Sequence, residues 1–219
     1  MKNEKMKKYL GFYIPYLLFV ATLLLLILCK GKADLHLWMT SFNSPIADVF
    51  FHYYTFVGDW VPYIVVAGLL FYKYRTALFV LTSLIVTGLI SRIIKVTWNE
   101  PRPILYFKEH FPDVQLHQIA GEHLHSMHSF PSGHTITAFA FFLALAFYAK
   151  RSSIHFLYFV LALLVGYSRI YLSQHFAIDV LVGSFVGVSM TIFCKFYFDK
   201  YTMKWADGSL RDVFSRKAS

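Results

Sequence analysis

Cysteine and charge are both scarce in this chain, and each scarcity excludes a class of protein. Only two cysteines occur in 219 residues, Cys29 and Cys194, and both lie in or at the ends of apolar runs. A disulfide framework is therefore excluded. Charged residues make up 15% of the chain against 57% hydrophobic residues, whereas a soluble domain carries about 25% charged residues. The composition indicates an integral membrane protein.

Acidic residues are scarcer than basic ones. The chain has 12 Asp and Glu against 21 Lys and Arg, a net charge of +9 with neutral histidines. Such an excess can indicate a nucleic-acid partner, but the basic residues cluster at the ends of apolar runs, where they act as orientation signals. We therefore expect the bilayer, and no nucleic acid, as partner. Cys29 follows a Lys-rich start as in a lipoprotein signal, but the bulky Leu28 before it favours an uncleaved first span.

Six apolar segments are long enough, or nearly so, to cross a bilayer as helices. They are 9–28, 60–71, 76–96, 134–149, 155–172 and 177–197. We expect the second to extend backwards through 50–58, and the segment 35–56 to form an interfacial amphipathic helix. The sequence thus predicts an all-α, polytopic membrane protein with a six-span domain over 1–198. A cytoplasmic tail with little fold of its own follows over 199–219.

Lysine and arginine distribute unequally between the two sides of this predicted bundle. One side holds Lys2, Lys5, Lys7, Lys8, Lys73, Arg75, Lys150, Arg151, Lys195, Lys200, Lys204, Arg211, Arg216 and Lys217. The other holds Lys30, Lys32, Arg92, Lys95, Arg102, Lys108 and Arg169. The positive-inside rule then makes both termini cytoplasmic, so that 98–133 and the turn 173–176 face outward.

This topology gathers the unusual polar residues on the outer side. Three cations there have no equal set of nearby carboxylates: Lys95, Arg102 and Arg169. Convergent Arg and Lys near apolar walls typically bind phosphate. The run 131–134, Pro-Ser-Gly-His, opens a helix whose first N–H groups are unpaired and form an anion site. Within it Ser132 adds a hydroxyl donor, and Gly133 allows close backbone approach.

Two histidines complete a site for phosphoryl transfer. His175 and Asp179 are four residues apart, so on one helix face the carboxylate can orient the imidazole and leave its other nitrogen to attack phosphorus. His134 can protonate the leaving oxygen and later deprotonate water. The cations stabilise charge on the phosphate oxygens, so no metal and no cofactor is needed. Each piece alone has a structural interpretation, such as a satisfied helix-start histidine or a snorkelling lysine; the joint pattern favours catalysis.

Three motifs in this order resemble the type 2 phosphatidic acid phosphatase superfamily, in its membrane-integral bacterial branch. Residues 95–103 fit K-x6-R-P, 131–134 fit P-S-G-H, and 168–179 fit S-R-x5-H-x3-D. The resemblance implies phosphate binding by Lys95, Arg102, Ser132, Gly133 and Arg169. It also implies His175 as nucleophile, His134 as general acid and base, and Asp179 as the support of His175. A bacterial inner membrane with the site on the periplasmic, extracytoplasmic side is the implied location.

The predicted function is hydrolysis of a lipid phosphate monoester or diphosphate through a phospho-histidine. Candidate substrates are undecaprenyl diphosphate, phosphatidylglycerol phosphate, phosphatidic acid and lipid A phosphate, and the motifs do not choose among them. A lipid-to-lipid phosphotransferase could use the same site. A lipid or anion transporter would keep the cations but need no paired histidines, and a vanadate-dependent oxidase is disfavoured because those relatives are soluble. The oligomeric state stays open.

The segment 104–130 is rich in histidine. His123, His125 and His128 suggest zinc, but their spacing is loose and no cysteine accompanies them. Head-group recognition or a solvated lid is favoured instead.

Two further features of the sequence have competing interpretations. Gly183 and Gly187 form a small-xxx-small pattern in the sixth span, where close packing within the bundle is favoured over dimerisation. Asp48 and Asp59 either contact substrate or cap helices, and neither is assigned.

Overall fold

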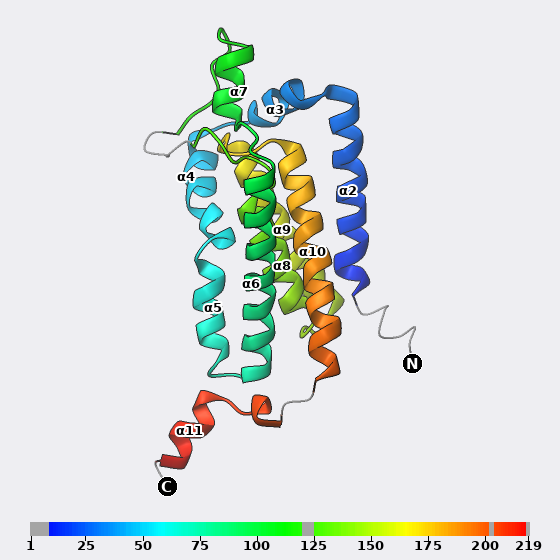
Figure 1. The fold of residues 1–219 in the computed structure, drawn as a ribbon, viewed down its shortest axis with the longest axis vertical. Coiled ribbons are helices and arrows are strands. Elements are labelled where there is room, and N and C mark those ends of the chain that lie inside the picture. Colours follow the sequence, from blue (N-terminus) through cyan, green and yellow to red (C-terminus); the bar gives the residue numbers. More distant parts are fainter. Residues whose placement is uncertain (1–8, 120–124, 202–203, 218–219) are drawn as a thin grey trace.

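The chain folds as a bundle of helices. The structure, a computed structural model, describes residues 9–119, 125–201 and 204–217, and those ranges contain helices and no strand. Four long helices run along the bundle in Figure 1: α2 (Leu10–Lys30), α6 (Tyr74–Thr97), α9 (Ser152–Tyr171) and α10 (Ala177–Lys200). The shorter α8 (Gly133–Ala146) packs against α6, α9 and α10, and it is buried along most of its length. A helix that is apolar all round suits this central place. The all-α prediction is confirmed.

Four helices are long and apolar enough to cross a membrane, namely α2, α6, α9 and α10. The predicted fourth span is the apolar helix α8, which has 14 residues. The predicted second span is not one helix. It consists of α4 (Pro45–Tyr54), η1 (Thr55–Gly58) and α5 (Val61–Leu69), which follow one another down one side of the bundle in Figure 1.

The prediction of one interfacial helix over 35–56 is wrong, because the chain breaks there. Helix α3 (Lys32–Thr40) ends before α4 begins at Pro45. Ser44 caps α4 by accepting a hydrogen bond from the Ala47 backbone N–H at 3.2 Å. Proline has no N–H to donate to a preceding turn, so it begins a helix readily but cannot extend one.

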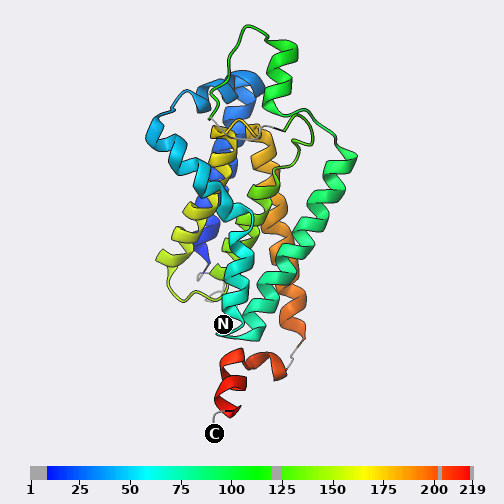
Figure 2. The same cartoon turned by 90° about the vertical axis from the view of Figure 1, so that its left-hand side faces the viewer.

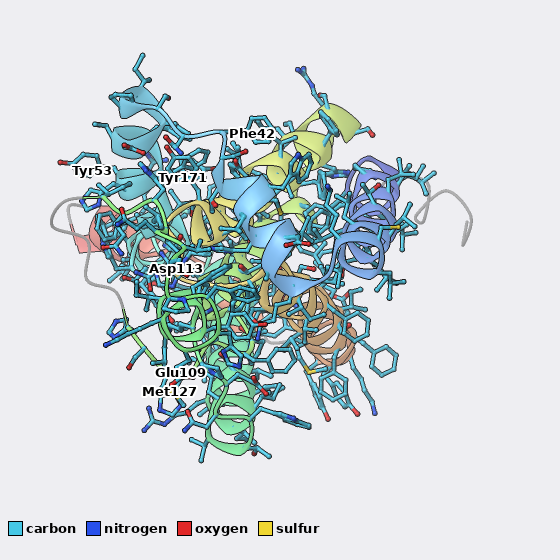
Figure 3. All side chains as sticks on the ribbon, turned by 90° about the horizontal axis from the view of Figure 1, so that it is seen from above. Phe42, Tyr53, Glu109, Asp113, Met127 and Tyr171 are labelled. Atoms are coloured by element: carbon cyan, nitrogen blue, oxygen red, sulfur yellow. The ribbon has the colours of Figure 1, made fainter. Side chains whose placement is uncertain are left out.

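The two ends of the bundle differ in what covers them. Helices α3, α4 and α7 (Pro103–His110) lie at one end, named here the cap end, while η2 (Lys204–Asp207) and α11 (Leu210–Lys217) lie at the other, the tail end (Figures 1 and 2). Figure 3 looks onto the cap end, where Tyr171 at the end of α9 lies beside α4. Because α6 and α9 finish at the cap end and α8 and α10 start there, the segments joining these helices meet at that end.

The tail has more structure than the sequence analysis predicted. The Leu210 N–H donates to the Leu70 carbonyl at 2.9 Å, and Lys73 Nζ lies 3.0 Å from Asp207 Oδ1. These contacts attach η2 and α11 to the connection between α5 and α6. The expectation of a tail with little fold is therefore wrong.

Helix α10 packs closely on α8 through two glycines. A Cβ at Gly187 would lie 2.6 Å from the Ile136 carbonyl oxygen, and one at Gly183 would lie 2.9 Å from the Ser132 carbonyl oxygen. Both distances are too short for any side chain. The interpretation of these glycines as packing residues within the bundle is confirmed.

Candidate active site

The residues of all three motifs lie together at the cap end. Lys95 is in the last turn of α6, and Ser132 directly precedes α8. Arg169 is in the last turn of α9, and Asp179 is in the first turn of α10. Each motif therefore sits where a helix starts or stops, and the alternating direction of the helices brings these termini to one place.

His175 and Asp179 form a buried pair. The exposed fraction of the surface is 1% for His175 and 2% for Asp179. His175 precedes α10, which begins at Ala177, so the two residues do not share one helix face as the spacing predicted. They nevertheless meet, with Nδ1 of His175 3.5 Å from Oδ2 of Asp179. The same Oδ2 accepts the Phe176 backbone N–H at 2.9 Å, so that Asp179 also caps α10.

Ser129 is the third member of this group, and no motif contains it. Its hydroxyl donates to Oδ2 of Asp179 at 2.5 Å and lies 3.4 Å from Nδ1 of His175. Ser129 is fully buried, and its own N–H donates to the Glu100 carbonyl at 3.0 Å. Ser129, which comes from a different segment of the chain, thus contacts both the Asp179 carboxylate and the Nδ1 side of the His175 imidazole.

The segment 172–176, named here the His175 turn, is built on the backbone of Arg169. The N–H groups of Gln174 and His175 both donate to the Arg169 carbonyl, at 3.0 and 3.1 Å. Ser173 adopts φ 50°, in the left-handed region. The residue that carries a site cation therefore also anchors the turn that carries His175.

Arg102 is attached to the same turn. Its Nη1 donates to the Gln174 side-chain oxygen at 2.6 Å and to the Gln174 carbonyl at 3.3 Å. Its Nε donates to the Met127 carbonyl at 3.0 Å. The arginine of the first motif is thereby fixed beside the histidine of the third.

Lys95 joins the first motif to the second. A Cβ placed on Gly133 would lie 3.8 Å from Lys95 Cε, which puts the lysine side chain beside the start of α8. Its Nζ donates to the His128 carbonyl at 2.7 Å.

The irregular element η1 supports the site from the side. Arg169 Nη1 donates to the Thr55 hydroxyl at 2.6 Å. A Cβ on Gly58 would lie only 2.7 Å from the His134 carbonyl oxygen, so η1 packs directly on the first turn of α8. His134 lies within electrostatic range of Arg169, His175, Arg102 and Lys95. The break in the predicted second span thus supplies two contacts to the site.

The environment of His175 favours its neutral form. Burial lowers its pKa well below the ordinary 6.5, and the charges of Arg102, Arg169 and Lys95 lower it further. At neutral pH the imidazole is therefore uncharged, and one ring nitrogen keeps its lone pair.

A cavity of about 430 Å³ lies beside the pair. It is lined by Lys32, Trp98, Glu100, Phe130, Ile178 and Asp179. The cavity thus touches both the end of α6 and the start of α10, and Figure 2 shows α6 leaning away from the bundle at this end.

The histidine-rich segment is tied to the bundle through Asp48. His117 Nε2 lies 2.8 Å from Asp48 Oδ1, and the Tyr171 hydroxyl donates to the same oxygen. His123, named in the zinc interpretation, lies outside the described residues. Within the described ranges, no group of three or more His, Cys, Asp or Glu could hold a metal ion.

Comparison with known proteins decides the family. The model of the PAP2 superfamily matches residues 76–203, more than half of the chain. The chain belongs to the PAP2 superfamily. The resemblance drawn from the three motifs is thereby confirmed.

Curated relatives carry the names of lipid phosphatases. Phosphatidylglycerophosphatase B of Bacillus subtilis is 32% identical over 152 residues, which cover 64% of this chain and 68% of the relative. Lipid A 1-phosphatase of Rhizobium johnstonii is 29% identical over 117 residues, 53% of this chain and 45% of the relative. The chain thus spans less than half the length of the latter.

Solved structures share the fold. The crystal structure of LpxE from Aquifex aeolicus has a TM-score of 0.66 at 25% identity and covers 76% of this chain and 95% of that one. A transmembrane PAP2-type phosphatidylglycerolphosphate phosphatase from Bacillus subtilis has a TM-score of 0.61 at 23% identity, covering 87% and 98%. Together with the four long apolar helices, the family identifies an integral membrane protein.

Proposed function

We propose that this chain is a lipid phosphatase that hydrolyses a phosphate monoester or diphosphate through a phospho-histidine intermediate and without a metal ion. One observation carries the proposal. His175, which pairs with the buried Asp179, lies on the same turn that binds Arg102 through Gln174. A nucleophile and an anion-binding group are therefore fixed to each other before any substrate arrives.

The first step uses both histidines. Nε2 of neutral His175 attacks phosphorus while the bond from phosphorus to the lipid oxygen breaks, and His134 gives that oxygen a proton. Asp179 and Ser129 hold the Nδ1 side, so that Nε2 carries the lone pair. In the second step His134 takes a proton from water, the water oxygen attacks phosphorus, and the phosphorus–nitrogen bond breaks to release phosphate.

The remaining site residues bind the phosphoryl oxygens in this proposal. They are Lys95, Arg102, Ser132, Gly133 and Arg169. Their donors and charges stabilise the negative charge that spreads over these oxygens in the transition state, a role that metal ions fill in other phosphoryl-transfer enzymes.

The proposed membrane arrangement has six crossings. The helices α2, α6, α8, α9 and α10 each make one, and α4, η1 and α5 together make the other. The cap end faces the extracytoplasmic side of a bacterial inner membrane. The charge distribution makes both termini cytoplasmic, and with them the tail 199–219 that follows the membrane domain 1–198. The cavity between α6 and α10 would let a lipid chain stay in the bilayer while its phosphate reaches the site.

The names of the relatives support a phosphorylated lipid as the substrate. Those names include lipid A 1-phosphatase, phosphatidylglycerophosphatase B and dihydrosphingosine 1-phosphate phosphatase. We therefore propose a panel of lipid A phosphate, phosphatidylglycerol phosphate, phosphatidic acid and undecaprenyl diphosphate as candidate substrates.

Phosphate release from this panel in detergent tests the proposal. We expect the wild type to release phosphate from at least one lipid with or without chelator, and His175→Ala to lose about 10⁴-fold or more in turnover. Undiminished release by the variant would contradict the nucleophile assignment, and loss of activity with chelator would contradict the metal-free step. Labelled phosphate passing to an added lipid acceptor instead of water would identify a phosphotransferase.

A further inference from the structure

Two histidines outside the three motifs are fully buried, one at each end of the bundle. His36 belongs to α3 at the cap end, and His155 belongs to α9 near the tail end. Both are 0% exposed, and Nδ1 of each has no hydrogen-bond partner within the described residues. They differ in what the other ring nitrogen contacts.

His36 contacts the His175 turn. Its Nε2 lies 3.3 Å from the Ser173 hydroxyl oxygen, two residues before His175. The ring packs between Phe107 and Phe176, with centroids 5.7 and 5.3 Å away. By contrast, Nε2 of His155 lies 3.3 Å from the Ala149 carbonyl oxygen, in the connection between α8 and α9.

The contact of His36 is a hydrogen bond from a neutral ring. Burial lowers the pKa of His36 to about 4, against a smaller opposite effect of Asp179. Because an unpaired N–H is costlier to bury than a bare acceptor, the proton belongs on Nε2, and the ring donates to Ser173. A neutral donor of this kind adds no charge to the site.

Ser173 has an unfavourable backbone conformation, so a hydrogen bond to its side chain helps to hold the turn in place. It has φ 50°, a conformation that residues with a side chain rarely adopt and that persists only when the surroundings enforce it. The next two residues are Gln174, which binds Arg102, and His175 itself. Any rotation at Ser173 would therefore move the anion-binding group and the nucleophile together.

We propose that His36 is a positioning residue, which fixes the His175 turn through the Ser173 hydroxyl. The inference rests on the proposed function of His175 as nucleophile. It adds α3, which lies outside the matched family region, to the groups that set the rate of the reaction.

The test compares variants of the two buried histidines, using the panel lipid that the wild type hydrolyses fastest. His36→Phe keeps an aromatic ring among Phe107 and Phe176 but removes the donor, and we expect kcat to fall about 10- to 100-fold with little change in KM. His36→Gln places an N–H near the position of Nε2 and restores most of kcat. The matched control His155→Phe leaves kcat within about twofold of the wild type, because that ring does not contact the turn.

Ser173→Ala removes the same bond from the other side. We expect it to lower kcat as His36→Phe does, and the double variant to be no slower than either single one. If His36→Phe does not fold, the kcat values of Ser173→Ala and His36→Gln still test whether the hydrogen bond to Ser173 matters. Full kcat in His36→Phe or Ser173→Ala, or an equal loss in His155→Phe, would overturn the inference. If the wild type hydrolyses no lipid phosphate, the proposed function itself fails. This result differs from failure of the His36 inference, in which the wild type is active and the variants are not slower.

Discussion

Ionisable groups at the two ends of the bundle occupy opposite environments. At the tail end the side chains of Lys73 and Asp207 are 40% and 55% exposed and pair with each other. At the cap end the side chains of His175 and Asp179 are 1% and 3% exposed. Exposed ion pairs contribute little to stability, whereas taking an ionisable group out of water costs several kcal/mol. The requirements of folding therefore explain the exposed ion pair at the tail end but not the buried pair at the cap end.

The partners of the cap-end cations differ in kind from those at the tail end. Arg102 donates to the Met127 carbonyl and to the carbonyl and side-chain amide of Gln174. These neutral acceptors orient the guanidinium without cancelling its charge. Lys73, by contrast, has a carboxylate partner. The hydrogen bonds of Arg102 thus leave its charge for the phosphate of the proposed reaction, with Asp179 as a nearby opposite charge, and the predictions below test this contrast.

After the loss expected for His175→Ala, the largest effect belongs to Asp179→Asn. Asparagine keeps an oxygen that can accept the Phe176 N–H, so the cap of α10 survives while the charge beside His175 is lost. We expect kcat to fall about 10³- to 10⁴-fold, as when the carboxylate of another His–Asp pair is neutralised. Steady-state kinetics measure this loss. An effect confined to KM would show that Asp179 does not act through His175.

The next effect belongs to Arg102→Lys, which keeps the charge but loses the planar fork. Lysine cannot bind Gln174 and a phosphate at the same time with fixed geometry, so we expect kcat/KM to fall about 10²-fold. The matched variant at the tail end is Lys73→Arg, which should leave kcat/KM unchanged. Equal effects of the two variants would remove the distinction between the ends.

A smaller loss is expected for Ser129→Ala. The variant removes one hydrogen bond to a buried carboxylate, and we expect kcat to fall about tenfold or more. Ser129→Thr, which keeps the hydroxyl, should retain more activity than the alanine variant if the larger side chain fits. Wild-type kcat in Ser129→Ala would limit the hydroxyl to a structural role.

The sequence predicted where the motif residues meet better than it predicted the residues that contact them. The motif residues could be placed because apolar runs alternate in direction, so that residues distant in the chain meet at one end. The contacts of Thr55, Ser129, Gln174 and His36 were missed because each partner comes from another part of the fold, and no local spacing marks such a contact.

Other features were missed although the sequence marks them. Ser44 followed by Pro45 is a strong signal for the start of a helix, which the apolar pattern of 35–56 obscured. Ser209 and Asp212 have the spacing of a capping box, and the Ser209 N–H donates to Asp212 Oδ2 at 2.8 Å. The high polarity of the tail predicts little structure, but this capping box marks the start of α11.

The pH dependence of turnover should report the buried state of His175. Its pKa lies below 6.5, so the imidazole stays neutral as pH falls and protonates only at more acidic pH. We expect the acid limb of kcat/KM below pH 6.5. Lys95→Met removes one of the charges that lower this pKa, so the limb should move to higher pH in the residual activity. A limb that stays fixed would assign it to another group.

The smallest effect is expected at the tail end, for Asp207→Asn. The carboxylate lies 3.0 Å from Lys73 and 3.4 Å from Arg75, and these contacts hold its pKa below the ordinary value. We expect a slightly lower Tm in detergent, with a difference from the wild type that shrinks as salt screens the exposed charges. Turnover should not change, since α11 lies at the opposite end of the bundle from His175. A loss of kcat in Asp207→Asn would mean that the two ends are coupled through α6, whose first turn carries Arg75 and whose last turn carries Lys95.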